Sequence, residues 1–351
     1  MNKILQEDAE NIIREPIKWE RLKGKRIMVT GASGMVGSYV MRTLVCLNEE
    51  KNYDIHIIGV VRNIKKVAKE FIENSNVEII SHDVSQPFHY EGAIDFVIHA
   101  ASPASPLIMK DQPVETVAAN ALGAFYTLQL AKEKKVEEYV FISSREIYGQ
   151  PYEGQEMFTE DTYGFVDPLD PRSCYPEGKK VAETMCAAYS AEYGLNAKSA
   201  RLAHTYGPGM SIYDGRVQAD FLNNVIHDED IVLKSEGLPV RTYTYISDAV
   251  AGIFFVLLNG TEKAYNIGDE NAKISIRGLA ELLVSIVPEK KLSLKFDIPE
   301  GGLKGTAPFT LGILDSQRLR QLGWKPRYTI EEGFRRMIEY LEIEKAEGRL
   351  S

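Results

Sequence analysis

The sequence has few cysteines, no excess of basic residues and no long apolar run. Its three cysteines, Cys46, Cys174 and Cys186, have no metal-ligand spacing, and their odd number in 351 residues argues against a disulfide framework. The longest strongly apolar run, AGIFFVLL from Ala251, is far too short to span a bilayer, and the N-terminus carries no export signal. We therefore expect a cytoplasmic protein with no bound metal and no membrane partner.

The charge and composition indicate an ordinary folded protein. Forty-one basic residues stand against fifty acidic ones, which gives a net charge of -9, and the basic positions are scattered along the chain. Nucleic acid is therefore not an expected partner. With 44% hydrophobic residues and no repeat or low-complexity tract, the chain is expected to form one large domain or two intimate ones.

Between Lys25 and Leu195, short β-branched runs alternate with longer helical patterns. The predicted strands are RIMVT, DIHIIGVV, NVEIIS, IDFVIHA and EYVFISS, and the helical patterns between them include VGSYVMRTLVCLN and VETVAANALGAFYTLQLAKEKK. This alternation predicts an α/β fold with a doubly wound parallel sheet of the Rossmann type.

Three regions are predicted along the chain. Residues 1–23 form a helical extension whose amphipathic stretch ILQEDAENII serves packing or an interface. Residues 24–202 form a dinucleotide-binding domain. Residues 203–351 form a smaller, irregular substrate-binding lobe that is partly interleaved with the first, because YTYISDAVAGIFFVLLNG and AYNIG have the pattern of a helix and strand that return to it.

The segment RIMVTGASGMVGSYV predicts a phosphate-binding turn. Gly31, Gly34 and Gly37 stand between a strand and a helix, where glycines permit a tight turn and the helix N-terminus attracts a pyrophosphate. The alternative, a purely structural turn, fits the strand–turn–helix context less well.

Two residues bear on which dinucleotide binds. After the second strand an acidic residue would suit the ribose of NAD, but IIGVVRN offers Arg62, whose guanidinium suits the 2'-phosphate of NADP. A solvated loop arginine is an equal alternative. Asp83 in SHDVS is expected either to contact the adenine edge or to serve as an ordinary turn aspartate.

The segment CYPEGKK places Tyr175 and Lys179 on one face at the start of a helix. A nearby cation favours the phenolate form of tyrosine, which is otherwise a poor base at neutral pH. Ser144, near the carboxyl end of the fifth predicted strand, is expected in the same crevice, with Glu146 as a second acid or base. A capped surface helix and a solvated loop carboxylate are the alternatives.

Taken in order, TGASGMVG, HAASPASP, SSREIYG and CYPEGKK resemble the extended short-chain dehydrogenase/reductase family, the NAD-dependent nucleotide-sugar epimerases and dehydratases. The resemblance runs from about Gly24 to Trp324. Within that family ASPASP, PRSCYPEGKKVAETMC and DGRV look most like the UDP-glucuronate decarboxylases that make UDP-xylose.

The resemblance implies roles for particular residues. Tyr175 is the base, Lys179 also binds the nicotinamide ribose, Ser144 matches the catalytic serine or threonine, and Glu146 assists. The three glycines hold the cofactor pyrophosphate. The predicted cofactor site further includes Ser33, Met35, Val36, Arg62, Asp83, Val84, Ala100, Ala101, Ser102 and Asn120. The predicted substrate contacts are Ser102, Arg145, His204, Arg216 and Arg241.

Four residues depart from the decarboxylase pattern. Arg145 replaces a small hydroxyl residue, and either grips a substrate carboxylate or pairs with a neighbouring acid. His204 replaces an asparagine that contacts substrate, Gly209 replaces a larger and often basic residue, and Arg62 replaces an acidic one.

The first prediction is therefore a UDP-glucuronate decarboxylase that oxidises C4 transiently, loses CO2 and returns the hydride. The alternatives are a sugar-nucleotide 4,6-dehydratase or 4-epimerase, an NADPH-dependent keto-sugar reductase, and a noncatalytic dinucleotide-binding member. The helices around Ala121 to Lys132 and Val181 to Tyr193 are rich in small and apolar residues. The resemblance implies that they pair across a homodimer; burial within the monomer is the alternative.

Overall fold

The computed structural model of the chain describes residues 2–298 and 312–350. Its centre is a seven-stranded sheet, ordered β3-β2-β1-β4-β5-β6-β10, in which all neighbouring strands run parallel. The strands are β1 (Arg26–Thr30), β2 (His56–Val61), β3 (Val77–Ser81), β4 (Phe96–His99), β5 (Glu138–Ser144), β6 (Ala197–Leu202) and β10 (Ala264–Ile267). The predicted doubly wound parallel sheet is confirmed, and the five predicted strands are β1 to β5.

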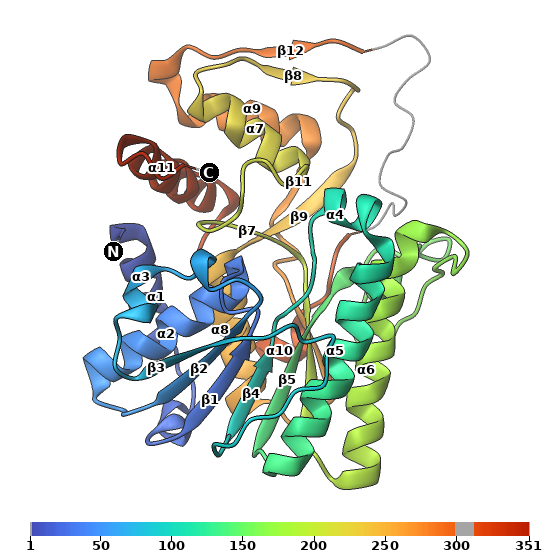
Figure 1. Ribbon diagram of the computed structural model, residues 1–351. Coiled ribbons are helices and arrows are strands. Elements are labelled where there is room, and N and C mark those ends of the chain that lie inside the picture. The colour runs from blue at the N-terminus through green and yellow to red at the C-terminus, as the bar shows by residue number, and fades with distance from the viewer. Residues whose placement is uncertain (1, 299–311, 351) are drawn as a thin grey trace.

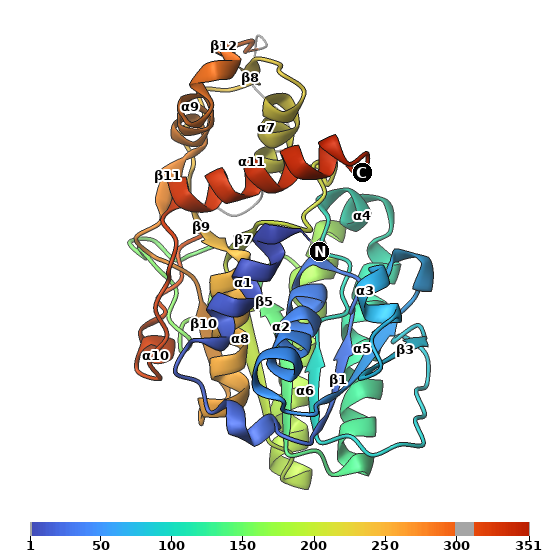
Figure 2. The ribbon, with the colours of Figure 1, turned by 90° about the vertical axis from the view of Figure 1, so that its left-hand side faces the viewer.

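Helices cover both faces of this sheet, as Figures 1 and 2 show. One face carries α5 (Pro113–Lys134) and α6 (Cys174–Tyr193), and the other carries α1 (Lys3–Ile13), α2 (Met35–Lys51) and α8 (Ile246–Asn259). Alternation along a strand separates the two cores, because Ile27 and Val29 join the cluster under α2 whereas Met28 joins the cluster under α5.

A late part of the chain completes the sheet. β10 pairs with β6, and α8 lies between the sheet and other helices, so that nearly every one of its residues is buried. The run AGIFFVLL is therefore a core helix. No helix among the described residues has the length and apolar character that a bilayer crossing requires.

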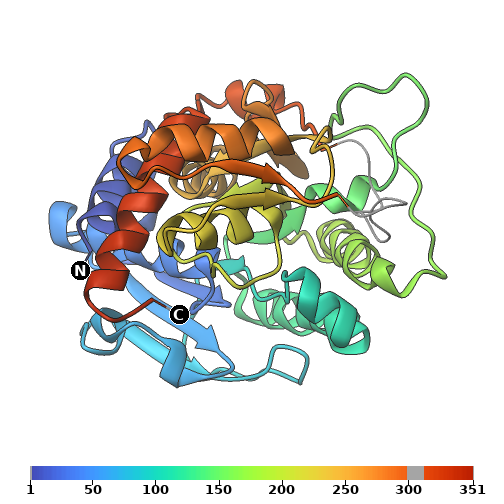
Figure 3. The same cartoon turned by 90° about the horizontal axis from the view of Figure 1, so that it is seen from above.

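Much of the described chain after β6 forms a smaller lobe above the carboxyl edge of the sheet (Figure 1), and Figure 3 views the molecule from above. It contains a three-stranded sheet, ordered β11-β9-β7, and a two-stranded parallel pair, β8 and β12. The strands are β7 (His204–Tyr206), β8 (Ile231–Leu233), β9 (Val240–Tyr245), β11 (Lys273–Ser275) and β12 (Leu294–Phe296). The helices are α7 (Val217–Ile226), α9 (Ile276–Ile286) and α11 (Ile330–Ala346). Residues 299–311 and 351 of the predicted substrate-binding lobe, and residue 1 of the predicted extension, lie outside the described residues.

Short elements connect these parts. The α-helices are α3 (Lys69–Ile72), α4 (Pro106–Asp111) and α10 (Gln317–Arg320). The 3-10 helices are η1 (Trp19–Leu22), η2 (Ile64–Lys66), η3 (Arg145–Tyr148), η4 (Pro171–Ser173) and η5 (Pro288–Lys290). Two of them, η3 and η4, follow β5 and precede α6, so they lie at the edge of the sheet where parallel α/β folds bind ligands.

The N-terminal helix α1 is fastened by a buried carboxylate. Asp8 accepts hydrogen bonds from the hydroxyls of Tyr39 on α2 and Tyr245 at the end of β9, at 2.9 and 2.8 Å, and from Arg336 on α11 at 2.7 Å. Burial raises the pKa of Asp8, while the Arg336 charge and the tyrosine hydroxyls act against that rise. One side chain thus joins α1 to both lobes.

Candidate active site

The turn between β1 and α2 is shaped for a pyrophosphate. Gly31 has a φ of +69°, and a Cβ atom there would lie 2.8 Å from backbone atoms of Ala101. A Cβ on Gly37 would overlap the carbonyl oxygen of Gly31. Gly34 is the N-cap of α2, whose first amide groups face this turn. The backbone can therefore approach a bound dinucleotide closely, and the residues present fit NAD.

Beside this turn lies a cavity of about 500 Å³ that reaches the carboxyl ends of β2 and β3. Of the predicted cofactor residues, it is lined by Gly31, Ser33, Gly34, Arg62, Asp83, Val84, Ala100, Ala101 and Ser102. Lys66, His82 and Asn63 also line it, and these three were not predicted. The corner beyond β2 thus holds two cations, Arg62 and Lys66.

Asp83 is held by its own turn. Its carboxylate accepts hydrogen bonds from the amide and hydroxyl of Ser85, at 2.9 and 2.7 Å. Burial raises the pKa of Asp83, but the Ser85 hydrogen bonds and the Arg62 charge outweigh it, so the pKa is lowered. Asp83 is therefore a turn aspartate that also lines the cavity.

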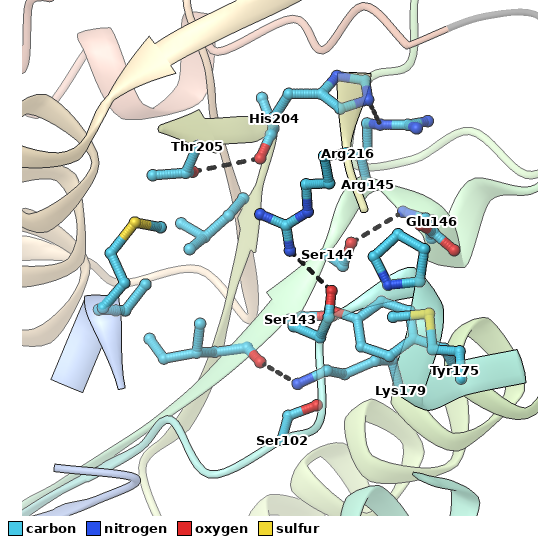
Figure 4. A pocket seen from close by; sticks show the side chains of 18 of the residues that line it. Ser102, Ser143, Ser144, Arg145, Glu146, Tyr175, Lys179, His204, Thr205 and Arg216 are labelled. Atoms are coloured by element: carbon cyan, nitrogen blue, oxygen red, sulfur yellow. Dashed lines mark hydrogen bonds between the residues drawn. The ribbon is translucent and has the colours of Figure 1, made fainter. Parts of the chain in front are cut away.

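A second cavity, of about 180 Å³, adjoins the first, because Ala100 and Ser102 line both. Figure 4 shows Ser144, Glu146, Tyr175 and Lys179 around it, together with Arg145, His204 and Arg216. Met35 and Val36, at the start of α2, line it too. Side chains from both lobes therefore enclose this second cavity, which we call the reaction cavity.

Asn120 lies behind this junction and orients Ser102. It is fully buried on α5, accepts a hydrogen bond from the Ser102 hydroxyl at 2.8 Å, and donates to the carbonyl of Thr116 at 2.8 Å. Asn120 lines neither cavity itself, and it acts on both by orienting the hydroxyl of Ser102.

Tyr175 and Lys179 lie on the first turns of α6, and both are buried. Burial raises the pKa of Tyr175 to about 12, and the charge of Glu146 adds to that rise, whereas a hydrogen bond with Ser144 and the charges of Arg216 and Arg172 oppose it. Burial lowers the pKa of Lys179 to about 7. The Lys179 ammonium donates to the carbonyl of Ile142 at 2.7 Å, which holds it under the reaction cavity.

Glu146 does not stand alone in the wall of the reaction cavity. Arg172, on η4, donates to both of its carboxylate oxygens, at 3.0 and 2.9 Å. One guanidinium nitrogen, Nη2, makes both hydrogen bonds, and this charge-assisted contact holds the Glu146 carboxylate beside Arg172. The sequence prediction included Glu146 but no role for Arg172, although Arg172 lies three residues before Tyr175 in the quoted motif.

Arg145 and His204, which both depart from the decarboxylase sequence pattern, contact each other. The Nε of Arg145 donates to the Nε2 of His204 at 3.2 Å, which leaves the proton of a neutral histidine on Nδ1. Burial, followed by the charges of Arg145, Arg241 and Arg216, holds the pKa of His204 well below its usual value. Arg145 is itself buried, and both residues line the reaction cavity.

The other two predicted substrate arginines come from the second lobe. Arg216, the N-cap of α7, lines the reaction cavity and donates to the carbonyl of Ala104 at 2.7 Å. Arg241, on β9, is not part of the cavity lining, but its charge still lowers the pKa of Arg145 and of His204.

Several buried polar atoms of the reaction cavity lack a hydrogen-bond partner in the described structure. They are the Oγ of Ser143, the Nη1 of Arg172 and the Nδ1 of His204. Among the described residues no group of His, Cys, Asp and Glu has the arrangement of a metal site.

A doubly wound sheet, a glycine turn fitted to a dinucleotide and a serine–tyrosine–lysine group in the adjoining cavity define a nicotinamide-dependent enzyme of the short-chain dehydrogenase/reductase class. The model of the NAD dependent epimerase/dehydratase family matches residues 27–268, and the chain belongs to that family.

Similar proteins are nucleotide-sugar enzymes. UDP-glucuronic acid decarboxylase 1 of Xenopus tropicalis is 32% identical over 97% of this chain and 79% of the relative. UDP-glucuronic acid decarboxylase 6 of Arabidopsis thaliana is 32% identical over 90% of this chain and 88% of the relative. The resemblance found in the motifs therefore extends over most of the chain.

Solved structures share the fold. UDP-glucose 4-epimerase from Thermotoga maritima, with UDP-glucose, has a TM-score of 0.74 and 23% identity and covers 92% of this chain and 99% of its own. A variant of UDP-glucuronic acid 4-epimerase from Bacillus cereus, with UDP-4-deoxy-4-fluoro-glucuronic acid and NAD, has a TM-score of 0.73 and 22% identity and covers 90% of this chain and 98% of its own.

Proposed function

We propose that the chain is a nucleotide-sugar decarboxylase that converts UDP-glucuronate to UDP-xylose with bound NAD. The observation that carries this proposal is the reaction cavity, in which Ser144, Tyr175 and Lys179 lie among arginines that suit an acidic sugar nucleotide. The relatives named UDP-glucuronic acid decarboxylases, at 32% identity, support the same substrate.

NAD, held at the glycine turn, supplies hydride transfer to and from C4 of the sugar. Tyr175 takes the proton of the 4-hydroxyl while Ser144 holds that oxygen, and the resulting 4-ketone lies β to the carboxylate. The bond between C5 and C6 then breaks, its electron pair passes into an enolate, and CO2 leaves. C5 gains a proton, Tyr175 returns its proton to the 4-oxygen, and no net oxidant is consumed.

The arginines divide the substrate between them in this proposal. We assign the diphosphate to Arg216 and the N-terminus of α7, where the ten-residue helix adds its dipole to the guanidinium charge. We assign the sugar carboxylate to Arg145, which follows Ser144 directly and is oriented by His204. Ser102, which lines the reaction cavity, completes the substrate contacts, and Arg241 adds its positive charge from outside the lining.

A second candidate is an NADPH-dependent keto-sugar reductase. The observation that favours it is the corner beyond β2, where Arg62 and Lys66 line the dinucleotide cavity at the place of the adenosine ribose. Two cations there suit the 2'-phosphate of NADP. In that case hydride would pass to a keto sugar, and Tyr175 would donate the proton.

One experiment separates these candidates. The purified protein is examined by mass spectrometry for bound nucleotides and is then given UDP-glucuronate without added cofactor. We expect bound NAD, release of CO2 and formation of UDP-xylose. We expect Tyr175→Phe to lose activity by ~100-fold or more, and Tyr193→Phe, at the half-exposed far end of the same helix, to retain it.

The other outcomes point elsewhere. A lack of turnover of every UDP-uronate would refute the decarboxylase. Inversion at C4 with the carboxylate retained would identify a 4-epimerase, and loss of water from a neutral sugar nucleotide a 4,6-dehydratase. Net oxidation of NADPH by a keto sugar would identify the reductase, and Arg62→Ala would then weaken NADP more than NAD.

We also propose that the protein is a cytoplasmic homodimer. Its cysteines are unpaired among the described residues, which suits a reducing compartment. The outer surfaces of α5 and α6 carry large exposed apolar side chains, including Val114, Leu122, Phe125 and Val181. Such a surface suits a second copy of the same helices.

A further inference from the structure

The ion pair between Arg172 and Glu146 is more than loop packing. Asp170 caps the backbone of η4 by accepting from the amide of Arg172 at 2.9 Å, and the Ser173 hydroxyl donates to the carbonyl of Asp167 at 2.5 Å. The backbone of η4 is thus held without the Arg172 guanidinium. The guanidinium instead binds the Glu146 carboxylate at the wall of the reaction cavity.

Charged and polar groups from five elements surround the Tyr175 phenol. They line the reaction cavity together with Tyr175 and are Ser144 at the end of β5, Arg145 and Glu146 on η3, Arg172 on η4, Lys179 on α6 and Arg216 at the start of α7. Glu146 is the anion of this set. Its charge opposes ionisation of the tyrosine, and the nearby arginines favour it.

We propose that Arg172 is a positioning residue for proton transfer at Tyr175: it fixes the Glu146 carboxylate against the cavity wall and offsets the charge that Glu146 presents to the phenol. This inference rests on the proposed role of Tyr175 as the proton acceptor, but not on the identity of the sugar. It explains how an acid can stand beside a tyrosine that must lose its proton.

Removal of the Arg172 charge and removal of the Glu146 charge are expected to shift the pKa of Tyr175 in opposite directions. Without the Arg172 charge, Glu146 acts on Tyr175 uncompensated, so the pKa of the phenol rises. Without the Glu146 charge, the arginines act alone, so the pKa of the phenol falls. We expect a shift on the order of one pH unit in each direction, which changes the phenolate fraction about tenfold at a pH below the midpoint.

The test uses four variants of the protein with bound NAD: Arg172→Met, Glu146→Gln, the double variant, and Arg172→Lys. Tyrosine labelled with carbon-13 at the ring carbon that bears the hydroxyl reports ionisation of the phenol by NMR in a titration to high pH, and Tyr175→Phe assigns the signal. We expect a higher titration midpoint in Arg172→Met, a lower one in Glu146→Gln, and a near-native midpoint in the double variant.

Arg172→Lys separates charge from geometry. A lysine keeps the charge but has a different length and lacks the planar guanidinium, so we expect a near-native pKa of the phenol with a less well positioned Glu146 and a lower kcat. The matched control is Arg277→Met, which removes an arginine from an exposed pair with Glu281 far from the cavity. We expect it to change neither readout.

Kinetics provides the second readout. For a substrate that turns over, the rising limb of kcat/KM should move to higher pH in Arg172→Met and to lower pH in Glu146→Gln. If either Arg172→Met or Glu146→Gln leaves the Tyr175 signal unmoved, or both move it in the same direction, the proposal is wrong. The NMR result stands even if UDP-glucuronate is not a substrate, so a failure of the proposed function is recognised separately.

Discussion

The ammonium group of Lys179 lies in a buried site, where burial disfavours the charged form. It is 2% exposed, its ammonium contacts the ring of Phe141, and its pKa is lowered to about 7 by burial. The unfolded chain holds this proton up to about pH 10. The unfolded state therefore binds more protons than the folded state between about pH 7 and pH 10, and the cost of the buried charge is fully present below that window.

Replacing Lys179 should consequently stabilise the protein while it abolishes activity. We expect Lys179→Met to raise the free energy of unfolding by ~2 kcal/mol near pH ~6 and to raise it much less near pH ~10, because the cost of the buried Lys179 charge disappears as pH rises through this window. Urea unfolding at a series of pH values, with activity measured in parallel, checks both parts.

The neighbouring residue provides the control. Lys180 is partly exposed on the same helix and pairs with Glu177 at 3.1 Å, so Lys180→Met should change stability little at any pH. A stabilisation by Lys179→Met that did not vary with pH would mean that side-chain packing, and not the buried charge, is responsible.

At the same scale, the sequence pattern predicted that Ser144, Tyr175 and Lys179 lie in one crevice, and all three line the reaction cavity. Tyr175 and Lys179 share a helix face, and Ser144 ends a predicted strand, so local pattern was enough to bring them together. Arg172 and Lys66 escaped notice because nothing in their local sequence separates a cavity arginine or lysine from a solvated one. Arg145 and His204, 59 positions apart, pair only because β5 and β6 are adjacent in the sheet.

At the scale of single elements, the hydrophobic pattern fails to predict strand β6. β6 was not among the predicted strands because it reads AKSARL, with Lys198 and Arg201 where apolar residues are expected. The structure shows the compensation: Lys198 pairs with Glu138 on β5, and Arg201 pairs with Glu183 on α6. A strand whose buried cations find partners on other elements cannot be recognised from its own sequence.

The buried partners of Asp8 predict how much α1 contributes to the stability of the fold. Asp8 is fully buried and accepts from three side chains of three elements, so Asp8→Ala leaves Arg336 facing a buried gap and two hydroxyls without an acceptor. We expect a loss of about 3 kcal/mol in the free energy of unfolding, measured by chemical denaturation. Hydrogen exchange should quicken in α11.

Glu7 offers a matched comparison on the same helix. It pairs with Arg336 at 3.0 Å but is half exposed, so Glu7→Ala should cost less than about 1 kcal/mol. Equal losses in the two variants would mean that the charge of Arg336, and not the buried network around Asp8, fastens the helix.

At the scale of the whole molecule, the helices that carry residues of the candidate active site also present an outward-facing surface. α5 carries Asn120, which orients Ser102, and α6 carries Tyr175 and Lys179, yet the outer sides of both helices are apolar and exposed. Figure 1 shows the two helices side by side on the open face of the sheet. A second copy that covers this surface would therefore restrain the elements that hold the proposed proton acceptor.

The prediction at this scale is that dimer formation and activity fall together. A variant with Leu122→Asp and Val181→Asp places a charge on each exposed helix surface, without touching either cavity. We expect the native protein to have twice the chain mass by light scattering, because the exposed apolar side chains of α5 and α6 suit a second copy, and the variant to be a monomer. Its turnover should fall about tenfold as α6 loses its support.

Val232, which is comparably exposed on β8 in the other lobe, supplies the control: Val232→Asp should leave both mass and turnover unchanged. A native protein that is already a monomer would refute the dimer. A monomeric variant with full turnover would show that each chain holds its own α6 in place, so that the apolar surface serves assembly and not the site.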